Sequence, residues 1–292
     1  MQTVRTLKYA ALCVVLAGIA GIAGIAAEPA GPPAITPVVR LHRGAAARNA
    51  AKTAVIRDVL PGEIPGIRSS TVSLAPGVTH REPASAEEDR VFLVFAGNGE
   101  IAAGGKGYPV MRETIAHFPV GWSVDVKASG ARGLDILILR LTLTPVDRED
   151  LAAHTDLNRA AYVKTFKECE PYGEAIKSAK TVSRTLLPKD IVPRMAIGTV
   201  ETTGPDQVAP HRHPMLEQYF LGIEDNDITV VSDDTRTALK ANDLFHIPLG
   251  SNHGAEVADG RKLYYVWMDF FQDRKGLEWL NEHKPLVPAK RP

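Results

Sequence analysis

The sequence predicts an all-β protein in which one β-barrel unit occurs twice. Short apolar runs, many alternating with polar residues, recur from Val55 to Phe271 and are separated by Gly, Pro and Asn. This punctuation is typical of β-sandwiches and β-barrels. A polar, Ala-rich segment interrupts the runs near the middle, and a pair of motifs found before it is found again after it. We therefore expect two duplicated β domains.

The first barrel is predicted over residues 51–146 and the second over residues 191–272. In both, the strand signals are short stretches of high β propensity between turn residues. The clearest are Thr71–Leu74, Val91–Phe95, Trp122–Val126 and Leu134–Leu139 in the first barrel, and Met195–Val200 and Lys262–Phe271 in the second.

Two helical regions are expected outside the barrels. In the segment 147–190, Leu151, Leu157, Ala161 and Phe166 recur at roughly helical spacing, which predicts one or two linking helices. The tail, residues 273–292, carries apolar side chains at Leu277, Trp279 and Leu280. We expect it to form a short amphipathic helix packed on the outside of a barrel.

The amino terminus has the order of a secretory signal peptide. Arg5 and Lys8 precede an apolar run over residues 9–26 that ends in small residues. The rival interpretation is an uncleaved anchor helix, but glycines break the run and prolines follow it directly. We therefore expect residues 1–26 to be removed and the protein to be periplasmic or secreted. Residues 27–50 are rich in Ala, Pro and Gly without a period, so they predict a flexible leader.

Composition and charge exclude several kinds of partner. The chain is 45% hydrophobic and 23% charged, with 34 basic and 34 acidic residues, which is a soluble globular profile. Loss of residues 1–26 removes two basic residues, so the mature balance is 32 minus 34, or −2. No basic patch indicates nucleic acid, and no basic run indicates a membrane surface after signal cleavage. The expected partner is a small-molecule substrate, and the oligomeric state is left open, a homo-oligomer included.

Three imidazoles and a carboxylate are gathered in two short motifs. His211 and His213 are two residues apart, so their side chains point the same way in an extended segment. Glu217 follows, and His253 closes the motif Pro-Leu-Gly-Ser-Asn-His at residues 248–253. Imidazole together with carboxylate suits iron, manganese, nickel or zinc. The sequence therefore predicts one divalent metal ion held by His211, His213, Glu217 and His253.

The pattern His-x-His, a carboxylate four residues on and Pro-x-Gly-x-x-His resembles the paired motifs of the cupin superfamily. This resemblance implies double-stranded β-helix barrels with a divalent metal in the barrel mouth. The sequence departs from the family pattern at turn positions, where Asn242 and Val257 replace the usual residues. It also leaves a choice of fourth ligand, because Gln218 sits at a spacing that some cupins use. Glu217 is favoured, since an anionic oxygen holds a hard divalent ion better than an amide does.

An internal repeat predicts that the chain is a bicupin. Residues 80–83, His-Arg-Glu-Pro, match residues 211–214, His-Arg-His-Pro, at an offset of 131. Residues 117–121 match residues 246–250 at an offset of 129. The second match pairs His117 with His246. Because this histidine is present in both copies, we interpret it as structural.

The first copy lacks two of the ligands. Glu82 stands in the place of His213, and the apolar Val124 stands in the place of His253. His80 with nearby carboxylates would make a weak site at most. We therefore expect a degenerate first barrel that serves as a packing partner.

The resemblance implies an exported metal-dependent enzyme that acts on a small oxygen-rich organic molecule. Dioxygenases, decarboxylases, isomerases and lyases share such ligand sets, and fold alone does not choose among them. Aromatic side chains near the motifs favour oxygenase chemistry slightly. The alternatives are a non-catalytic protein that binds a sugar or carboxylate with the help of the metal, and a purely structural bicupin.

Overall fold

The computed structural model describes residues 38–41, 53–153, 158–189, 191–213, 215–273 and 276, and all of these belong to one compact unit. The predicted signal peptide, most of the predicted leader and nearly all of the predicted C-terminal helix lie outside the described residues. Within them, strands far outnumber helices. The predicted all-β class is therefore confirmed. None of the helices in the described ranges is long and apolar enough to cross a membrane.

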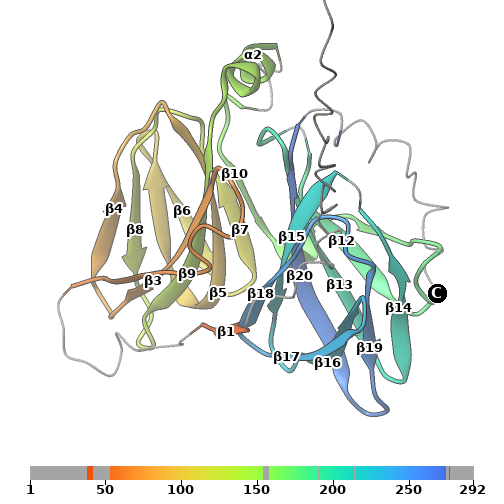
Figure 1. Cartoon of the computed structure of the whole chain (residues 1–292). Helices are drawn as coiled ribbons and strands as arrows, with labels where there is room; N and C mark the ends of the chain where they lie inside the picture. Colours follow the sequence, from red (N-terminus) through yellow and green to blue (C-terminus); the bar gives the residue numbers. More distant parts are fainter. Residues whose placement is uncertain are drawn as a thin grey trace, which may run out of the picture. The chain divides into compact units, whose positions relative to one another are not determined.

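The strands from β2 to β9 build the first barrel (Figure 1). The long strand β5 pairs with β9 and β7 through its first half and with β6 and β8 through its second half, so it passes from one layer of the barrel to the other. Side chains such as Phe92, Val126 and Ile138 form the core of this barrel. The strands are β2 (Val55–Asp58), β3 (Ile67–Leu74), β4 (Thr79–Glu82), β5 (Glu88–Ala103), β6 (Lys106–Met111), β7 (Thr114–His117), β8 (Val124–Ala128) and β9 (Leu134–Thr142).

Two sheets build the second barrel. A seven-stranded sheet has the order β1-β18-β15-β20-β13-β12-β11, and a four-stranded sheet has the order β14-β19-β16-β17. Their facing side chains, among them Val208, Phe220 and Phe245, form a separate core, here called the second-barrel core. The strands are β11 (Pro171–Tyr172), β12 (Val182–Leu187), β13 (Met195–Thr203), β14 (Asp206–His211), β15 (Leu216–Gly222), β16 (Asp227–Ser232), β17 (Thr235–Lys240), β18 (Asp243–Ile247), β19 (His253–Val257) and β20 (Lys262–Phe271).

A third apolar cluster, here called the interbarrel core, contains side chains of both barrels. It includes Leu93 and Leu137 from the first barrel and Tyr219 and Leu221 from the second, all of them 0% exposed. Because side chains alternate along a strand, Tyr219 and Leu221 of β15 face the interbarrel core, whereas Phe220 between them faces the second-barrel core. Both faces of β15 are thus buried, and each face has its own partners.

The segment predicted as a helical linker is mostly extended. The helix α2 covers Pro145–Ala153 only. Beyond it, β10 (Tyr162–Thr165) pairs with β7 of the first barrel and β12 pairs with β13 of the second, with the short 3₁₀ turn η1 (Phe166–Glu168) between them. The prediction of one or two helices over residues 147–190 is therefore wrong beyond Ala153. This segment forms strands that pair with edge strands of both barrels. Such nonlocal pairing outweighs a weak helical periodicity in the sequence.

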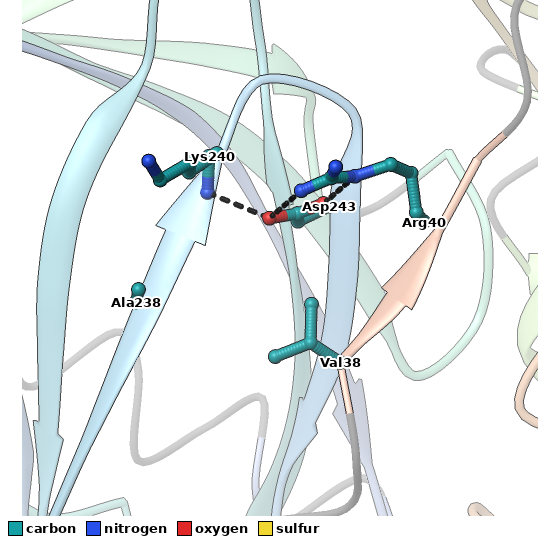
Figure 2. Close-up of a pocket in the computed structure, with 5 residues that line it drawn as sticks. All are labelled: Val38, Arg40, Ala238, Lys240 and Asp243. Carbon is teal, nitrogen blue, oxygen red and sulfur yellow. Dashed lines mark hydrogen bonds and ion pairs between the residues drawn. The ribbon is translucent and has the colours of Figure 1, made fainter.

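Part of the predicted leader is also a strand. In β1 (Val39–Arg40), Val39 pairs with Leu244 of β18, so a segment that precedes the first barrel completes the sheet of the second. The guanidinium of Arg40 binds the Asp243 carboxylate through Nε at 2.8 Å and Nη2 at 3.3 Å. Figure 2 shows this pair together with the Lys240 backbone N–H, which donates to the same carboxylate at 3.0 Å. The prediction of flexibility is therefore wrong for residues 39–40.

Candidate metal centre

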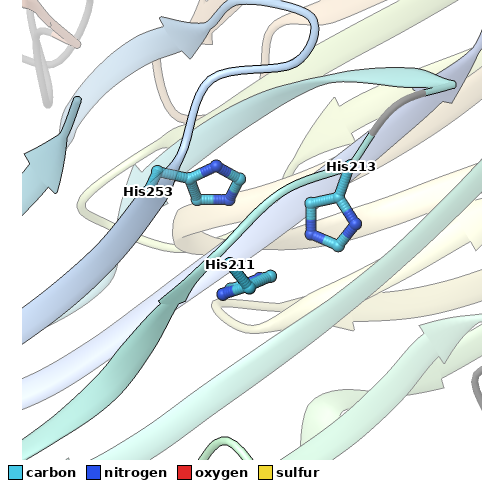
Figure 3. A group of neighbouring side chains, drawn as sticks. All are labelled: His211, His213 and His253. Carbon is cyan, nitrogen blue, oxygen red and sulfur yellow. The ribbon is translucent and has the colours of Figure 1, made fainter.

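Three histidines converge at one end of the four-stranded sheet of the second barrel. His211 at the end of β14 lies opposite His253 at the start of β19 in the strand register, and His213 follows as the chain leaves β14. The ring centroids are 4.7 Å apart for His211 and His213, 4.8 Å for His211 and His253, and 5.3 Å for His213 and His253. One ring nitrogen of each lies within 4.8 Å of the others (Figure 3). The structure thus brings together three of the four predicted ligands.

Backbone carbonyls fix the orientation of two of the rings. Nδ1 of His211 lies 2.8 Å from the carbonyl oxygen of Ala209, and Nδ1 of His253 lies 3.0 Å from that of Ser251. A carbonyl can only accept, so each Nδ1 carries the proton and each Nε2 keeps a lone pair. This is the tautomer that a metal ligand needs.

His253 has a buried nitrogen that lacks a hydrogen-bond partner. The residue is 2% exposed, and within the described part of the chain no donor or acceptor reaches its Nε2. Burial, together with the neighbouring His211, lowers the pKa of His253 to about 4, so the ring is neutral at neutral pH. A buried lone pair without a partner is unfavourable. A cation among the three rings would satisfy it, so the donor set fits a divalent metal.

Glu217 does not join the three histidines. It lies on the same face of β15 as Tyr219, which belongs to the interbarrel core, and its Oε2 is 2.7 Å from Nε2 of His246. His246 is 4% exposed and also contacts Glu63 through Nδ1 at 3.2 Å. The choice of Glu217 as fourth ligand is therefore corrected: its carboxylate serves the interface between the barrels.

The side chain of Gln218 instead faces the interior of the second barrel. It shares a face of β15 with Phe220, whose ring centroid is 5.8 Å from that of His253. Its Nε2 donates to Oδ1 of Asp269 on β20 at 2.6 Å, and its Oε1 is buried and has no hydrogen-bond partner among the described residues. The amide is therefore held with its oxygen available as a ligand. Gln218, rather than Glu217, is therefore the candidate for the fourth ligand.

Asp269 is a buried acid that lies outside the motifs of the sequence. Burial raises the pKa of its carboxyl to about 7, although the Gln218 amide opposes this by donating a hydrogen bond. Its signal was present in the sequence, because an Asp inside the apolar run 262–271 is unusual in a buried strand. Asp269 positions the Gln218 amide.

Arg140 of the first barrel occupies the strand position that Asp269 occupies in the second barrel. Arg140 of β9 pairs in register with Arg90, as Asp269 of β20 pairs with Gln218. The Arg140 guanidinium donates to Glu82 at 2.7 Å, and Glu82 contacts His80 at 2.7 Å.

The network around Arg140 is closed. Its members His80, Glu82 and Arg140 have side chains no more than 12% exposed, and Arg90 donates to the carbonyl oxygens of Pro83 and Trp122. The positive charge that balances Glu82 is thus built into the chain. This arrangement supports the prediction that the first barrel holds no metal.

The histidine repeated in both copies has the same role in each. His117 lies 2.7 Å from Asp89, and both side chains are 0% exposed. In the second copy His246 lies 2.7 Å from Glu217. The two carboxylates occupy matching positions, two residues before the cross-strand partner of the histidine. The interpretation of His246 as structural agrees with these contacts.

Comparisons with known proteins identify the fold. The sequence matches no protein-family model and no curated protein. Among solved structures, the putative glyoxylate induced protein from Pseudomonas aeruginosa matches with a TM-score of 0.63 and 14% identity, over 80% of this chain and 83% of that one. A cupin 2 conserved barrel domain protein from Leptotrichia buccalis matches with a TM-score of 0.56 and 16% identity, over 82% and 98%.

A third match is the oxalate decarboxylase of Bacillus subtilis, with a TM-score of 0.53 and 14% identity, over 80% of this chain and 73% of that one. These likenesses define the class of the protein: it has a cupin fold. The two barrels described above make this the duplicated, bicupin form of the fold, as the sequence motifs predicted.

Proposed function

We propose that this chain is an exported, metal-dependent enzyme that acts on a small, oxygen-rich organic molecule. The observation that carries the proposal is the convergence of three ring nitrogens within 4.8 Å, with the buried Nε2 of His253 left without a hydrogen-bond partner among the residues that the structure describes. Imidazole nitrogens with one amide oxygen suit iron, manganese, nickel or zinc. His211, His213, His253 and Gln218 would hold the ion.

The type of protein ligand favours catalysis over a structural metal. Structural zinc sites are closed by four protein ligands, usually with several thiolates, whereas the described site offers no cysteine. Four ligands around an ion that prefers six leave positions for substrate oxygens. When bound, the metal would supply Lewis-acid or redox chemistry to a substrate in those positions.

Residues around the site shield the histidines from water and orient the Gln218 side chain. Phe220 stacks on Tyr265 at 4.6 Å between centroids and contacts His253, so aromatic side chains wall one side of the triad. Asp269 holds the Gln218 amide. One solved structure with the same fold is an oxalate decarboxylase, which shows that the fold supports chemistry on a small oxygen-rich acid in that protein. Decarboxylase, oxygenase, isomerase and lyase reactions all remain within the proposal, with oxygenase chemistry preferred on the aromatic lining.

Elemental analysis of the purified protein tests the metal. The expected result is close to one equivalent of a transition metal per chain, lost in His253→Ala. The control is His80→Ala, which removes the first-barrel counterpart of His211 and should leave the content unchanged. A full equivalent in His253→Ala, or two equivalents in the wild type, would contradict the proposed site.

Turnover separates an enzyme from a binding protein. Metal-loaded protein is incubated with a panel of phenols, hydroxy acids and dicarboxylates, and oxygen uptake and product masses are recorded. Turnover that disappears in His253→Ala supports the enzyme. Tight binding of a sugar or carboxylate without turnover would favour the non-catalytic alternative.

Export is tested separately by the mass of the protein recovered from periplasm and medium. Cleavage after Ala26 or Ala27 is expected because small residues end the apolar run. Full-length protein retained in the membrane fraction would favour the anchor helix instead.

A further inference from the structure

A buried lysine lies inside the second barrel, on the segment that follows β11. The side chain of Lys177 is 6% exposed and forms an ion pair with Glu174. Its Nζ also donates to Oγ of Ser183 at 2.9 Å and lies 5.9 Å from the ring centroid of Tyr172. An ammonium group has three N–H donors. Among the described residues, Glu174 and Ser183 use two of them, so one remains for another acceptor.

The backbone around Lys177 runs beside the strand that carries a predicted metal ligand. Lys177 forms an isolated β-bridge with Val208 of β14, and the N–H of Ala209 donates to the carbonyl oxygen of Ile176 at 2.9 Å. The carbonyl of the same Ala209 orients His211. The segment therefore closes the barrel next to the histidines, although it is far from them in sequence.

The side chain of Lys177 points to the same interior as the histidines. Its partner Ser183 lies on β12 opposite Val200, and Val200 lies opposite Tyr265. The Tyr265 ring stacks on Phe220, and Phe220 contacts His253. Strand-register pairs and ring contacts thus connect Ser183, the partner of the ammonium, with His253.

The bridge partner of Lys177 confirms this direction. Val208 belongs to the second-barrel core, and residues directly opposite each other on neighbouring strands point to the same face. The interior of the second barrel therefore contains a cation separate from the three histidines.

We propose that Lys177 binds a carboxylate of an organic-acid substrate whose other oxygen atoms bind the metal. This inference rests on the proposed function and names its substrate class. A buried ammonium needs an opposite charge, and Glu174, whose side chain is 29% exposed, supplies one at the solvent side. A substrate carboxylate in the interior would share the ammonium with Glu174, so Glu174 competes with the substrate.

Binding to the metal-loaded protein tests this without turnover. The protein is loaded with Co²⁺, and its visible spectrum is followed during titration with malonate, succinate and glutarate, with neutral malonamide as control. We expect at least one dicarboxylate to change the spectrum at a concentration where malonamide does not. Lys177→Met should weaken that binding at least tenfold, because a charge-assisted contact is lost. Lys177→Arg should keep most of the affinity.

Glu174→Gln distinguishes this role from a purely structural ion pair. If Lys177 binds substrate, removal of the competing carboxylate strengthens dicarboxylate binding, so Glu174→Gln and Lys177→Met act in opposite directions. If the pair only fastens the segment, both variants weaken binding alike, and the inference is overturned.

The exposed Lys180 on the same segment provides the matched control. Lys180→Met should change nothing, and Co²⁺ content and circular dichroism are measured for every variant. Failure of the wild type to bind Co²⁺ would overturn the proposed metal site itself. Normal Co²⁺ binding without any response to dicarboxylates, or with a response unaffected in both Lys177→Met and Lys177→Arg, would overturn only the role of Lys177.

Discussion

Nε2 of His246 lies 2.7 Å from Oε2 of Glu217, and this contact assigns Glu217 to the interface between the barrels. Its neighbour Gln218 points the other way and donates to Asp269 at 2.6 Å. These two adjacent residues of β15 therefore have different roles. The Glu217 carboxylate takes part in the contacts between the barrels, and the Gln218 amide faces the interior of the second barrel.

The first prediction follows from this division. Gln218→Leu should weaken metal binding more than tenfold, since even the loss of a partner of a ligand costs about 10–100-fold. Glu217→Gln should leave metal affinity unchanged, because its side chain faces the opposite side of β15. Parallel metal titrations by calorimetry measure both. The reverse ranking would restore Glu217 as the ligand.

A second prediction concerns the arginine of the first barrel. Arg140→Met leaves the buried Glu82 carboxylate without its main partner, and removal of one member of a buried ion pair costs about 3–5 kcal/mol. The free energy of unfolding, measured with urea, should fall by that amount while metal content stays constant. The double variant Arg140→Met, Glu82→Met should be more stable than the single variant, since it buries no uncompensated charge. A double variant at least as unstable as the single one would show that the charges do not compensate each other.

Acid should weaken the folded state through Glu82. Burial alone would raise the pKa of this carboxyl, but hydrogen bonds with His80 and Arg140 outweigh burial and lower the pKa from 4.5 to about 2. Because the folded-state pKa is the lower one, the stabilisation is complete above about pH 5 and is lost as the pH falls towards about 2. The difference corresponds to about 3 kcal/mol. Unfolding curves of wild type and Glu82→Gln should therefore converge as the pH falls through this range, and a constant gap would contradict the assignment.

Removal of metal should lower thermal stability. A ligand that binds only the folded state adds about 2.7 kcal/mol at a free concentration of 100 times its Kd, which for a domain of this size raises Tm by roughly 5–10 °C. Chelation should reverse the shift in the wild type. In His253→Ala, Tm should not respond to metal or chelator, and a normal response there would place the ion elsewhere.

The sequence was informative where motifs are short and local. His211 and His213 are two residues apart at the end of one strand, and the register of β14 with β19 brings His253 opposite His211. Glu217 was favoured over Gln218 because a carboxylate is the stronger ligand, and that argument does not show which of two adjacent side chains faces the histidines. β14 ends at His211 and β15 begins at Leu216 in a different sheet. Because β14 and β15 lie in different sheets, the alternation of side chains along β14 does not predict which side chains of β15 face the interior of the second barrel.

Long-range pairing explains the other differences. The helical period after Ala153 was weak, and tertiary pairing of β10 and β12 with the two barrels replaced it with strands. Lys177 gave no signal in sequence, since its place beside Val208 depends on how residues 171–181 close the second barrel. Arg140 could be recognised only after the register of β9 with β5 was known.

The pairing of β1 with β18 has a consequence for the order in which the molecule is made. During translation, Val39 is synthesised some two hundred residues before Leu244, its partner in the sheet. Vectorial synthesis can complete the first barrel early, because strands β2 to β9 are contiguous in sequence. The second barrel gains one edge strand from a segment that is synthesised before the first barrel. Its edge at β18 is therefore covered only when both β1 and β18 are present. A second barrel produced alone would have that edge exposed, and exposed edges are where strands of other molecules pair.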